Sequence, residues 1–196
     1  MSAREVDMDP ASGRAQDQAM LAAGSKAIYP GQGPCRIGRI VKRDVDGVVV
    51  MFYHLIILDD GGGELFIPVQ KARAIGVRLL LKKSELPGLL AHLKKGVKAA
   101  DSWKQRAADN MKLFMSGSPF DLAEIVASLT ELSSTRSLTL GESGTLGRAR
   151  RLLISEISEV MGKTKTEAAE QVDRALKSRI EGVRRRLRLV NGTALP

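Results

Sequence analysis

The pattern of apolar residues changes near Gly76, and this change constrains the fold more than any other feature. From residue 28 to residue 76, β-branched and aromatic runs are interrupted by Gly, Pro and Asp, which is typical of short antiparallel strands. Beyond Gly76, apolar residues recur three and four positions apart, which indicates amphipathic helices. Strands followed by helices predict an α+β chain: a small SH3-like or Tudor-like β-barrel domain followed by a compact all-α helical bundle.

Glycine-rich turns delimit the strands of the predicted β domain. Asp46-Gly47 separates a strand at residues 35–42 from one at residues 48–58, and a turn at residues 59–63 leads into residues 64–68. About 45 residues of short strands must close on themselves or pair an edge with another chain. We therefore expect a sheet edge that is available for strand addition.

Start signals divide the second half into four or five helices with short loops. Ser102 is placed to cap a helix from Trp103 to Met115, and Pro119 stands at the first position of the next one. Thr139 and Thr164 each precede a Glu by three residues, the spacing of a capping box. A compact bundle is the expected arrangement of these helices.

Composition divides the chain into four expected segments. Residues 1–27 lack the apolar surface to offset ordering entropy and are expected to form a disordered tail. Residues 28–78 form the predicted β domain, and residues 79–176 form the helical domain, with a linker at residues 96–101. Residues 177–196 are expected to form a basic C-terminal helix or tail that extends beyond the bundle.

The net charge of +9 adds an anionic partner to the hypotheses, but the charge is uneven. Residues 29–100 carry 12 basic and 6 acidic side chains, whereas residues 101–175 carry 10 and 11. A single cysteine excludes a disulfide framework within one chain. No apolar run approaches the roughly 18 residues of a membrane span. We therefore expect a cytoplasmic protein.

The candidate chemical motifs do not assemble into an active site. Gly31-Gln32-Gly33 opens a strand, whereas a phosphate-binding loop opens a helix, so a turn is the better interpretation. Cys35 lies in strand alternation without an adjacent base, and His54 and His92 fit packing or surface positions. The sequence therefore favours a binding protein over an enzyme and implies neither a cofactor nor a metal.

Two basic features have both structural and functional interpretations. Trp103 is the only tryptophan and stands at the start of its predicted helix, beside Lys104 and Arg106. Helical spacing to Phe114 fits a core residue, whereas an exposed ring among cations could wedge against a base step. The second feature, Arg148-Ala149-Arg150-Arg151, fits either a solvated helix face or a face that contacts phosphates.

Five short motifs resemble the CarD/CdnL family of bacterial transcription regulators. They occur in the family's order between residues 27 and 175, and their joint spacing is more specific than any one of them. The motifs are Tyr29-Pro30-x-x-Gly33, Leu65-Phe66-Ile67-Pro68, Ala74-Ile75-Gly76-Val77-Arg78, Trp103-Lys104-Gln105-Arg106 with Asn110 and Gly117, and Ala149-Arg150-x-Leu152-Leu153.

We expect a monomer. The resemblance implies that it binds the β subunit of bacterial RNA polymerase through its Tudor-like domain. Its helical domain would contact promoter DNA at the upstream edge of the melted bubble and stabilise the open complex, as at ribosomal RNA promoters. Phe66 is a departure, because some relatives carry Arg there. The residues expected to contact polymerase are Arg43, Ile56, Phe66 and Pro68, and those expected to contact DNA are Trp103, Lys104, Arg106, Arg148, Arg150 and Arg151.

An alternative function belongs to a different class. The β-barrel and the arginines of residues 184–188 could serve an RNA- or ribosome-associated structural binding module. Recovery with ribosomes, and not with polymerase, would favour this alternative.

Overall fold

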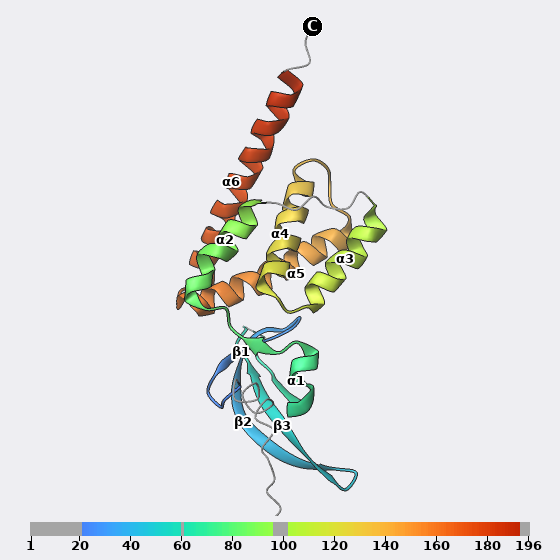
Figure 1. Cartoon of the computed structure of the whole chain (residues 1–196), viewed down its shortest axis with the longest axis vertical. Helices are drawn as coiled ribbons and strands as arrows, with labels where there is room; N and C mark the ends of the chain where they lie inside the picture. Colours follow the sequence, from blue (N-terminus) through green and yellow to red (C-terminus); the bar gives the residue numbers. More distant parts are fainter. Residues whose placement is uncertain (1–20, 60, 96–101, 193–196) are drawn as a thin grey trace, which may run out of the picture.

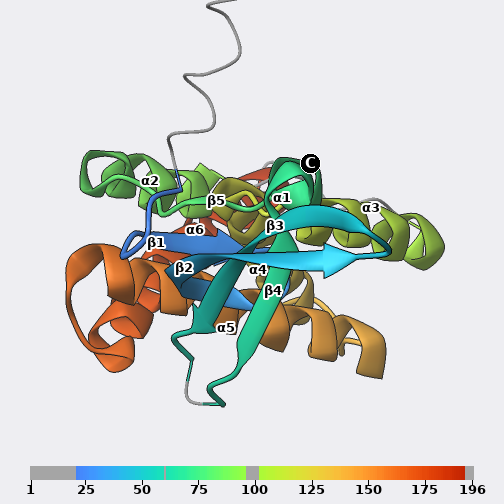
Figure 2. The ribbon, with the colours of Figure 1, turned by 90° about the horizontal axis from the view of Figure 1, so that it is seen from below.

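The computed structural model describes residues 21–59, 61–95 and 102–192, and it stacks a β-sheet against one end of a helical bundle (Figure 1). Most of the expected disordered tail and the whole expected linker at residues 96–101 lie outside the described residues. The sheet begins at Lys26. Seen from below, the strands cross the base of the bundle, with α2 and α3 on opposite sides (Figure 2).

The sheet is antiparallel and, in the described part of the chain, has five strands in the order β4-β3-β2-β1-β5. Its longest strands form a hairpin whose turn places Asp46 and Gly47 at φ angles of 54° and 78°, as a two-residue turn between twisted strands requires. The strands are β1 (Lys26–Tyr29), β2 (Gly33–Val45), β3 (Val48–Ile57), β4 (Glu64–Pro68) and β5 (Arg78–Leu79).

Alternate residues of these strands form the core of the β domain. Ile37, Leu55 and Cys35 are fully buried, and Tyr53 and Ile67 nearly so. A bulge between Ile37 and Ile40 shifts the register of β2 against β3, which bends the hairpin as such irregularities do. One face of the sheet therefore packs into the core, and the other face is partly exposed among the described residues.

A short helix and a short strand follow β4, and neither was predicted from the sequence. Helix α1 (Val69–Ile75) buries Ala72 and ends at Gly76, which adopts φ 91°. The chain then pairs β5 with β1. The expectation of strands and turns alone up to Gly76 was wrong here, because the seven residues of α1 are too few to show helical periodicity.

Among the described residues, five α-helices form the bundle, as expected from the start signals. They are α2 (Leu86–Lys95), α3 (Trp103–Met115), α4 (Pro119–Ser133), α5 (Leu140–Met161) and α6 (Lys165–Gly192), and a 3₁₀ turn, η2 (Lys83–Glu85), precedes α2. Thr139 and Glu142 form the predicted capping box, and Thr164 and Glu167 exchange the same two bonds. The bundle core includes Leu89, Leu93, Ile125, Leu129, Leu153, Ile157 and Val172.

The last helix extends beyond the bundle (Figure 1). Its first half contributes the buried Ala168, Val172 and Ala175 to the core. The expected basic C-terminal segment continues α6 without a break as far as Gly192, and residues 193–196 lie outside the described residues. The α+β class, with a small β domain followed by an all-α bundle, is confirmed.

Candidate polymerase-binding face and nucleic-acid interface

The four residues expected to contact polymerase share the outer face of β2, β3 and β4. Phe66 pairs in register with His54, Pro68 with Phe52 and Ile56 with Glu64. These positions alternate with the buried Tyr53, Leu55 and Ile67, so they point away from the core. Arg43 pairs with Val50, which alternates in the same way along β3.

Phe66 is the centre of a group of stacked side chains on this outer face. The guanidinium carbon of Arg43 lies 4.1 Å from the centre of the Phe66 ring, and 5.9 Å from that of Phe52. The His54 ring stacks on Phe66 with centroids 4.7 Å apart and planes 9° from parallel. Cation–π contact and stacking hold the Arg43 side chain over the sheet. Phe52 and His54 were not among the expected contact residues, although strand alternation places both beside Phe66.

Strand β4 forms one edge of the sheet. It pairs with β3 on one side, and no strand within the described residues pairs with its other side. An edge of this kind presents unpaired backbone donors and acceptors to a partner strand. The expected edge is therefore present, and it adjoins the face that carries Phe66 and Pro68.

The far end of the β2–β3 hairpin exposes apolar side chains that were not among the expected contact residues. Val48 is 62% exposed and Val49 is 65% exposed, and Val45, Met51 and Ile40 are also exposed. The signal in the sequence is the unbroken run Val48-Val49-Val50-Met51, which is apolar on both faces of a strand. Nothing within the described residues covers this end of the hairpin.

Trp103 is the first residue of α3, and its side chain is 63% exposed. The core interpretation of this tryptophan is therefore wrong, and Phe114, eleven residues later, contributes to the core instead. The ammonium of Lys104 lies 5.8 Å from the centre of the Trp103 ring. An exposed aromatic ring with a cation beside it, at a helix N-terminus, suits an anionic partner.

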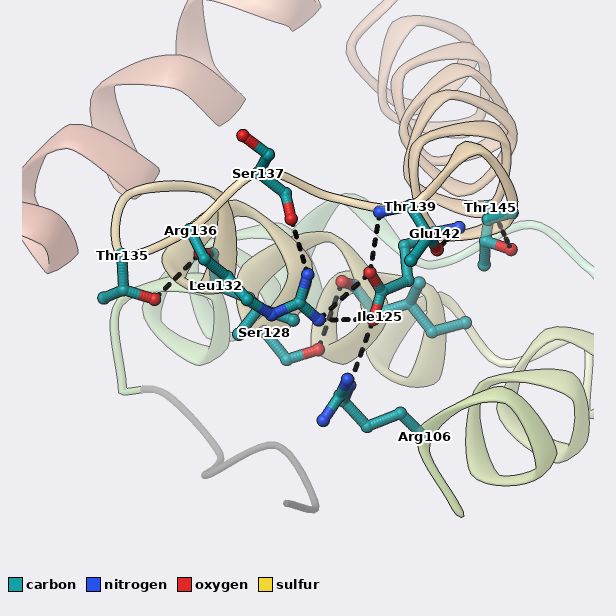
Figure 3. A network of polar contacts seen from close by, with 11 residues as sticks. Arg106, Ile125, Ser128, Leu132, Thr135, Arg136, Ser137, Thr139, Glu142 and Thr145 are labelled. Atoms are coloured by element: carbon teal, nitrogen blue, oxygen red, sulfur yellow. Dashed lines mark hydrogen bonds and ion pairs between the residues drawn. The ribbon is translucent and has the colours of Figure 1, made fainter. Parts of the chain in front are cut away.

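Arg106, expected to contact DNA, is buried and forms a salt bridge within the bundle. It is 8% exposed, and its Nε donates to Glu142 at 3.1 Å (Figure 3). Glu142 also accepts from Arg136 at 2.8 Å. The Arg136 hydrogen bond is the first cause that lowers the pKa of Glu142 to about 2, with the Thr139 N–H and Arg106 adding to it against desolvation. Arg106 thus joins α3 to the start of α5, and we remove it from the DNA-contacting set.

The three arginines of α5 have three different neighbours. Arg148 is exposed, with its guanidinium 5.7 Å from the Phe114 ring centre. Arg150 forms a salt bridge of 2.7 Å with Asp173, and Arg151 lies 3.8 Å from Asp59. Their neighbours lie on α3, on α6 and after β3, respectively. Arg150 and Arg151 have acidic neighbours, so they have less positive charge available for phosphate than the sequence suggests.

The described residues contain no group of three or more His, Cys, Asp and Glu that could hold a metal ion. Burial raises the pKa of the Cys35 thiol to about 11, so this cysteine is not an activated nucleophile. Across residues 21–59, 61–95 and 102–192, no helix is long and apolar enough to cross a membrane.

Comparison with known proteins gives two family matches that follow one another along the chain. Residues 21–79 match the CarD-like/TRCF RID domain, and residues 89–173 match the CarD C-terminal domain. A solved structure, the 72-residue N-terminal domain of Myxococcus xanthus CarD, is 35% identical over 31% of this chain and 79% of that chain, with a TM-score of 0.27. The chain therefore belongs to the CarD/CdnL family of RNA polymerase-interacting transcription regulators.

Proposed function

We propose that this protein binds the β subunit of RNA polymerase through its sheet and holds the promoter open with Trp103. The observation that carries the proposal is the 63% exposed Trp103 ring at the N-terminus of a helix. A second binding surface lies on the sheet, at the β4 edge and the Phe66 face. The protein acts as a monomer with two partners, polymerase and promoter DNA.

The polymerase contact combines backbone pairing with side-chain recognition. A strand of the β subunit adds to the open edge of β4, where main-chain hydrogen bonds supply affinity. Phe66 and Pro68 alternate along this strand and face the same side as Arg43. These side chains set the register and the specificity of the added strand.

The DNA contact uses Trp103 as a wedge at the upstream edge of the bubble. Its ring packs against a base step that is already partly unstacked, while Lys104 and the backbone N–H groups at the start of α3 face a phosphate. Such phosphate contacts carry no sequence information directly. Promoter choice therefore follows from the energetics of the DNA fork.

The free energies required are small. A change of about 1.4 kcal/mol between the open and closed complexes changes their ratio tenfold. The helical segment has no excess of positive charge, because residues 101–175 carry 10 basic and 11 acidic side chains. Docking on polymerase therefore supplies the effective concentration for an intrinsically weak DNA contact.

The test is the lifetime of the open promoter complex with Trp103→Ala. Met115→Ala is the matched control, since Met115 is 59% exposed at the other end of α3. We expect Trp103→Ala to shorten the lifetime about tenfold, the equivalent of about 1.4 kcal/mol, and Met115→Ala to leave it unchanged. An unchanged lifetime with Trp103→Ala, at equal polymerase binding, would contradict the wedge.

A further inference from the structure

A buried carboxylate lies where the β domain meets the bundle. Glu156 of α5 is 1% exposed, and it accepts hydrogen bonds from Arg78 Nη1 at 2.7 Å and Arg78 Nη2 at 2.8 Å. The N–H of Leu81 adds a third bond at 3.0 Å. Arg78 belongs to β5, so this bidentate pair joins the edge of the sheet to the middle of the bundle.

Arg78 also holds the loop that follows α3. Its Nε donates to the carbonyl oxygen of Gly117 at 2.6 Å, two residues after α3 ends at Met115. A single guanidinium therefore connects the sheet, α5 and the end of the helix that carries Trp103. A guanidinium suits this place because its donors form a rigid planar fork.

A buried charge of this kind favours one arrangement of the two domains. Glu156 has almost no access to water, so a shift of the β domain along α5 would leave its carboxylate without donors. An unpaired buried carboxylate is strongly unfavourable. The Arg78–Glu156 pair therefore selects the orientation in which all its hydrogen bonds are made.

Three glycines allow the close approach that this pair requires. A Cβ on Gly76 would lie 3.1 Å from Pro30 Cγ, and one on Gly117 would lie 3.0 Å from the same atom. Both glycines have positive φ angles, of 91° and 72°. A Cβ on Gly33 would lie 3.1 Å from Leu152 Cδ2. Pro30 is thus packed against two backbone segments, which leaves little room for a hinge.

Two ion pairs, one exposed and one partly buried, flank the junction. Lys26 of β1 meets Glu159 of α5 at 2.6 Å, and Lys165 of α6 meets Asp59, beyond β3, at 2.6 Å. Exposed pairs contribute little to stability individually. They join different strands to different helices, however, and so oppose rotation of one domain on the other.

We propose that Arg78 and Glu156 are positioning residues, which fix the polymerase-binding face and Trp103 at one separation. This inference rests on the proposed function and gives a role to Arg78, a motif residue that neither binding surface uses. Helix α3 has 13 residues, a length of about 20 Å. A tilt of about 10° at its Arg78-anchored end would move Trp103 by about 3 Å, close to the 3.4 Å spacing of nucleotides along a strand. A loose junction would therefore misplace the wedge by about one base step.

The first test is Glu156→Gln, which keeps the shape of the side chain and removes its charge. Glu131→Gln is the matched control, because Glu131 pairs with the buried Arg179 wholly within the bundle. We expect Glu156→Gln to bind polymerase as the wild type does and to shorten the open-complex lifetime at least fivefold. Glu131→Gln should leave both measurements unchanged.

The second measurement is the spread of distances between the domains, from spin labels on Val48→Cys and Leu140→Cys. These residues are 62% and 92% exposed and lie in the β domain and the bundle. We expect a narrow distribution with Glu131→Gln and a broad one with Glu156→Gln. A narrow distribution with Glu156→Gln, or a broad one with an unchanged open-complex lifetime, would overturn the proposal.

A rescue separates positioning from local damage. Lys26→Cys and Glu159→Cys, joined by a short bis-maleimide in the Glu156→Gln background, should restore the lifetime, and failure to do so would count against the proposal. If Glu156→Gln does not fold, Arg78→Lys replaces it in these experiments. Lysine keeps the positive charge but lacks the planar fork of donors, so we expect the same changes in lifetime and distance distribution, and the same results would overturn the proposal. A failure of the proposed function would give a different result from a failure of this inference. Trp103→Ala would then leave the open-complex lifetime unchanged while the Arg78–Glu156 junction is intact.

Discussion

Replacing Glu142 by Gln should destabilise the bundle at neutral pH and have a progressively smaller effect as the pH falls into the acid range. The Glu142 carboxylate accepts hydrogen bonds from Arg136, from the Thr139 N–H and from Arg106 (Figure 3). Chief among these, the Arg136 bond lowers its pKa from 4.5 to about 2. A pKa shift of this size limits the contribution of the Glu142 carboxylate to the free energy of unfolding to about 3 kcal/mol. Solvent screening reduces this contribution to about 1–2 kcal/mol.

The pH dependence of this contribution has a definite sign. Because the pKa of Glu142 is lower in the folded state, the unfolded state takes up the proton first as the pH falls. The stabilisation is therefore complete above pH 4.5 and is lost as the pH falls toward the folded pKa of about 2. The difference between wild type and Glu142→Gln should shrink over the same range.

Urea unfolding followed by circular dichroism, from about pH 7 to about pH 3, measures this difference. Glu170→Gln is the control, because Glu170 is an exposed acid on α6. A difference for Glu142→Gln that stays constant across this range, or that equals the difference for Glu170→Gln at every pH, would refute the reasoning.

Three further predictions concern the surfaces and the thiol. Phe66→Asp should abolish recovery of purified RNA polymerase in a pull-down, whereas Leu140→Asp, at a 92% exposed position of the bundle, should not. Recovery with Phe66→Asp equal to that of the wild type would contradict the proposed interface. Recovery of ribosomes in place of polymerase would favour the RNA-binding alternative. Iodoacetamide should not label Cys35 in the native protein near pH 8 and should label it after denaturation, because the thiol is buried and its pKa is raised to about 11; rapid native labelling would show that the β core opens. Free protein should bind duplex DNA with a Kd no tighter than about 1 μM at physiological salt, since nonspecific contacts have this strength; nanomolar affinity would show that polymerase is not needed to bring Trp103 to DNA.

Local signals predicted much of the fold because the responsible interactions are local. Asp46-Gly47 supplies the positive φ angles of the hairpin turn, and Thr139 with Glu142 satisfies N–H groups of its own helix. Signals of this kind need no knowledge of tertiary structure. Helix α3 was also predicted with the bounds that the structure gives, Trp103–Met115, and Ser102 occupies the expected N-cap position but makes no side-chain capping bond.

The role of Arg106 could not be predicted, because it depends on a residue 36 positions away. Beside Trp103 and Lys104, Arg106 is expected to belong to a basic surface, and its spacing of three residues from Trp103 supports that expectation. Only the tertiary contact with Glu142 shows that its side chain is buried. Glu142, which the sequence marks only as a capping residue, accepts a hydrogen bond from Arg106 as well as from Arg136. The same limit applies to Glu156, whose partner Arg78 lies 78 residues away.

The prediction that Trp103 is exposed depended on the family resemblance, because helical spacing alone fitted both a buried and an exposed side chain. The structure separates the two possibilities: Phe114 is buried while Trp103 is 63% exposed on the same helix. The exposed hairpin end was missed for a related reason. An apolar strand such as Val48-Val49-Val50-Met51 predicts burial, and only the three-dimensional arrangement shows that no described element covers it.

The central claim is that Trp103 reaches promoter DNA from a polymerase-bound protein. The most direct measurement replaces Trp103 by photoreactive benzoylphenylalanine and maps the crosslinks in complexes of polymerase and promoter. We predict crosslinks to DNA at the upstream edge of the bubble, which require both polymerase and promoter opening. Crosslinks to polymerase alone, or DNA crosslinks that form equally without polymerase, would contradict the claim.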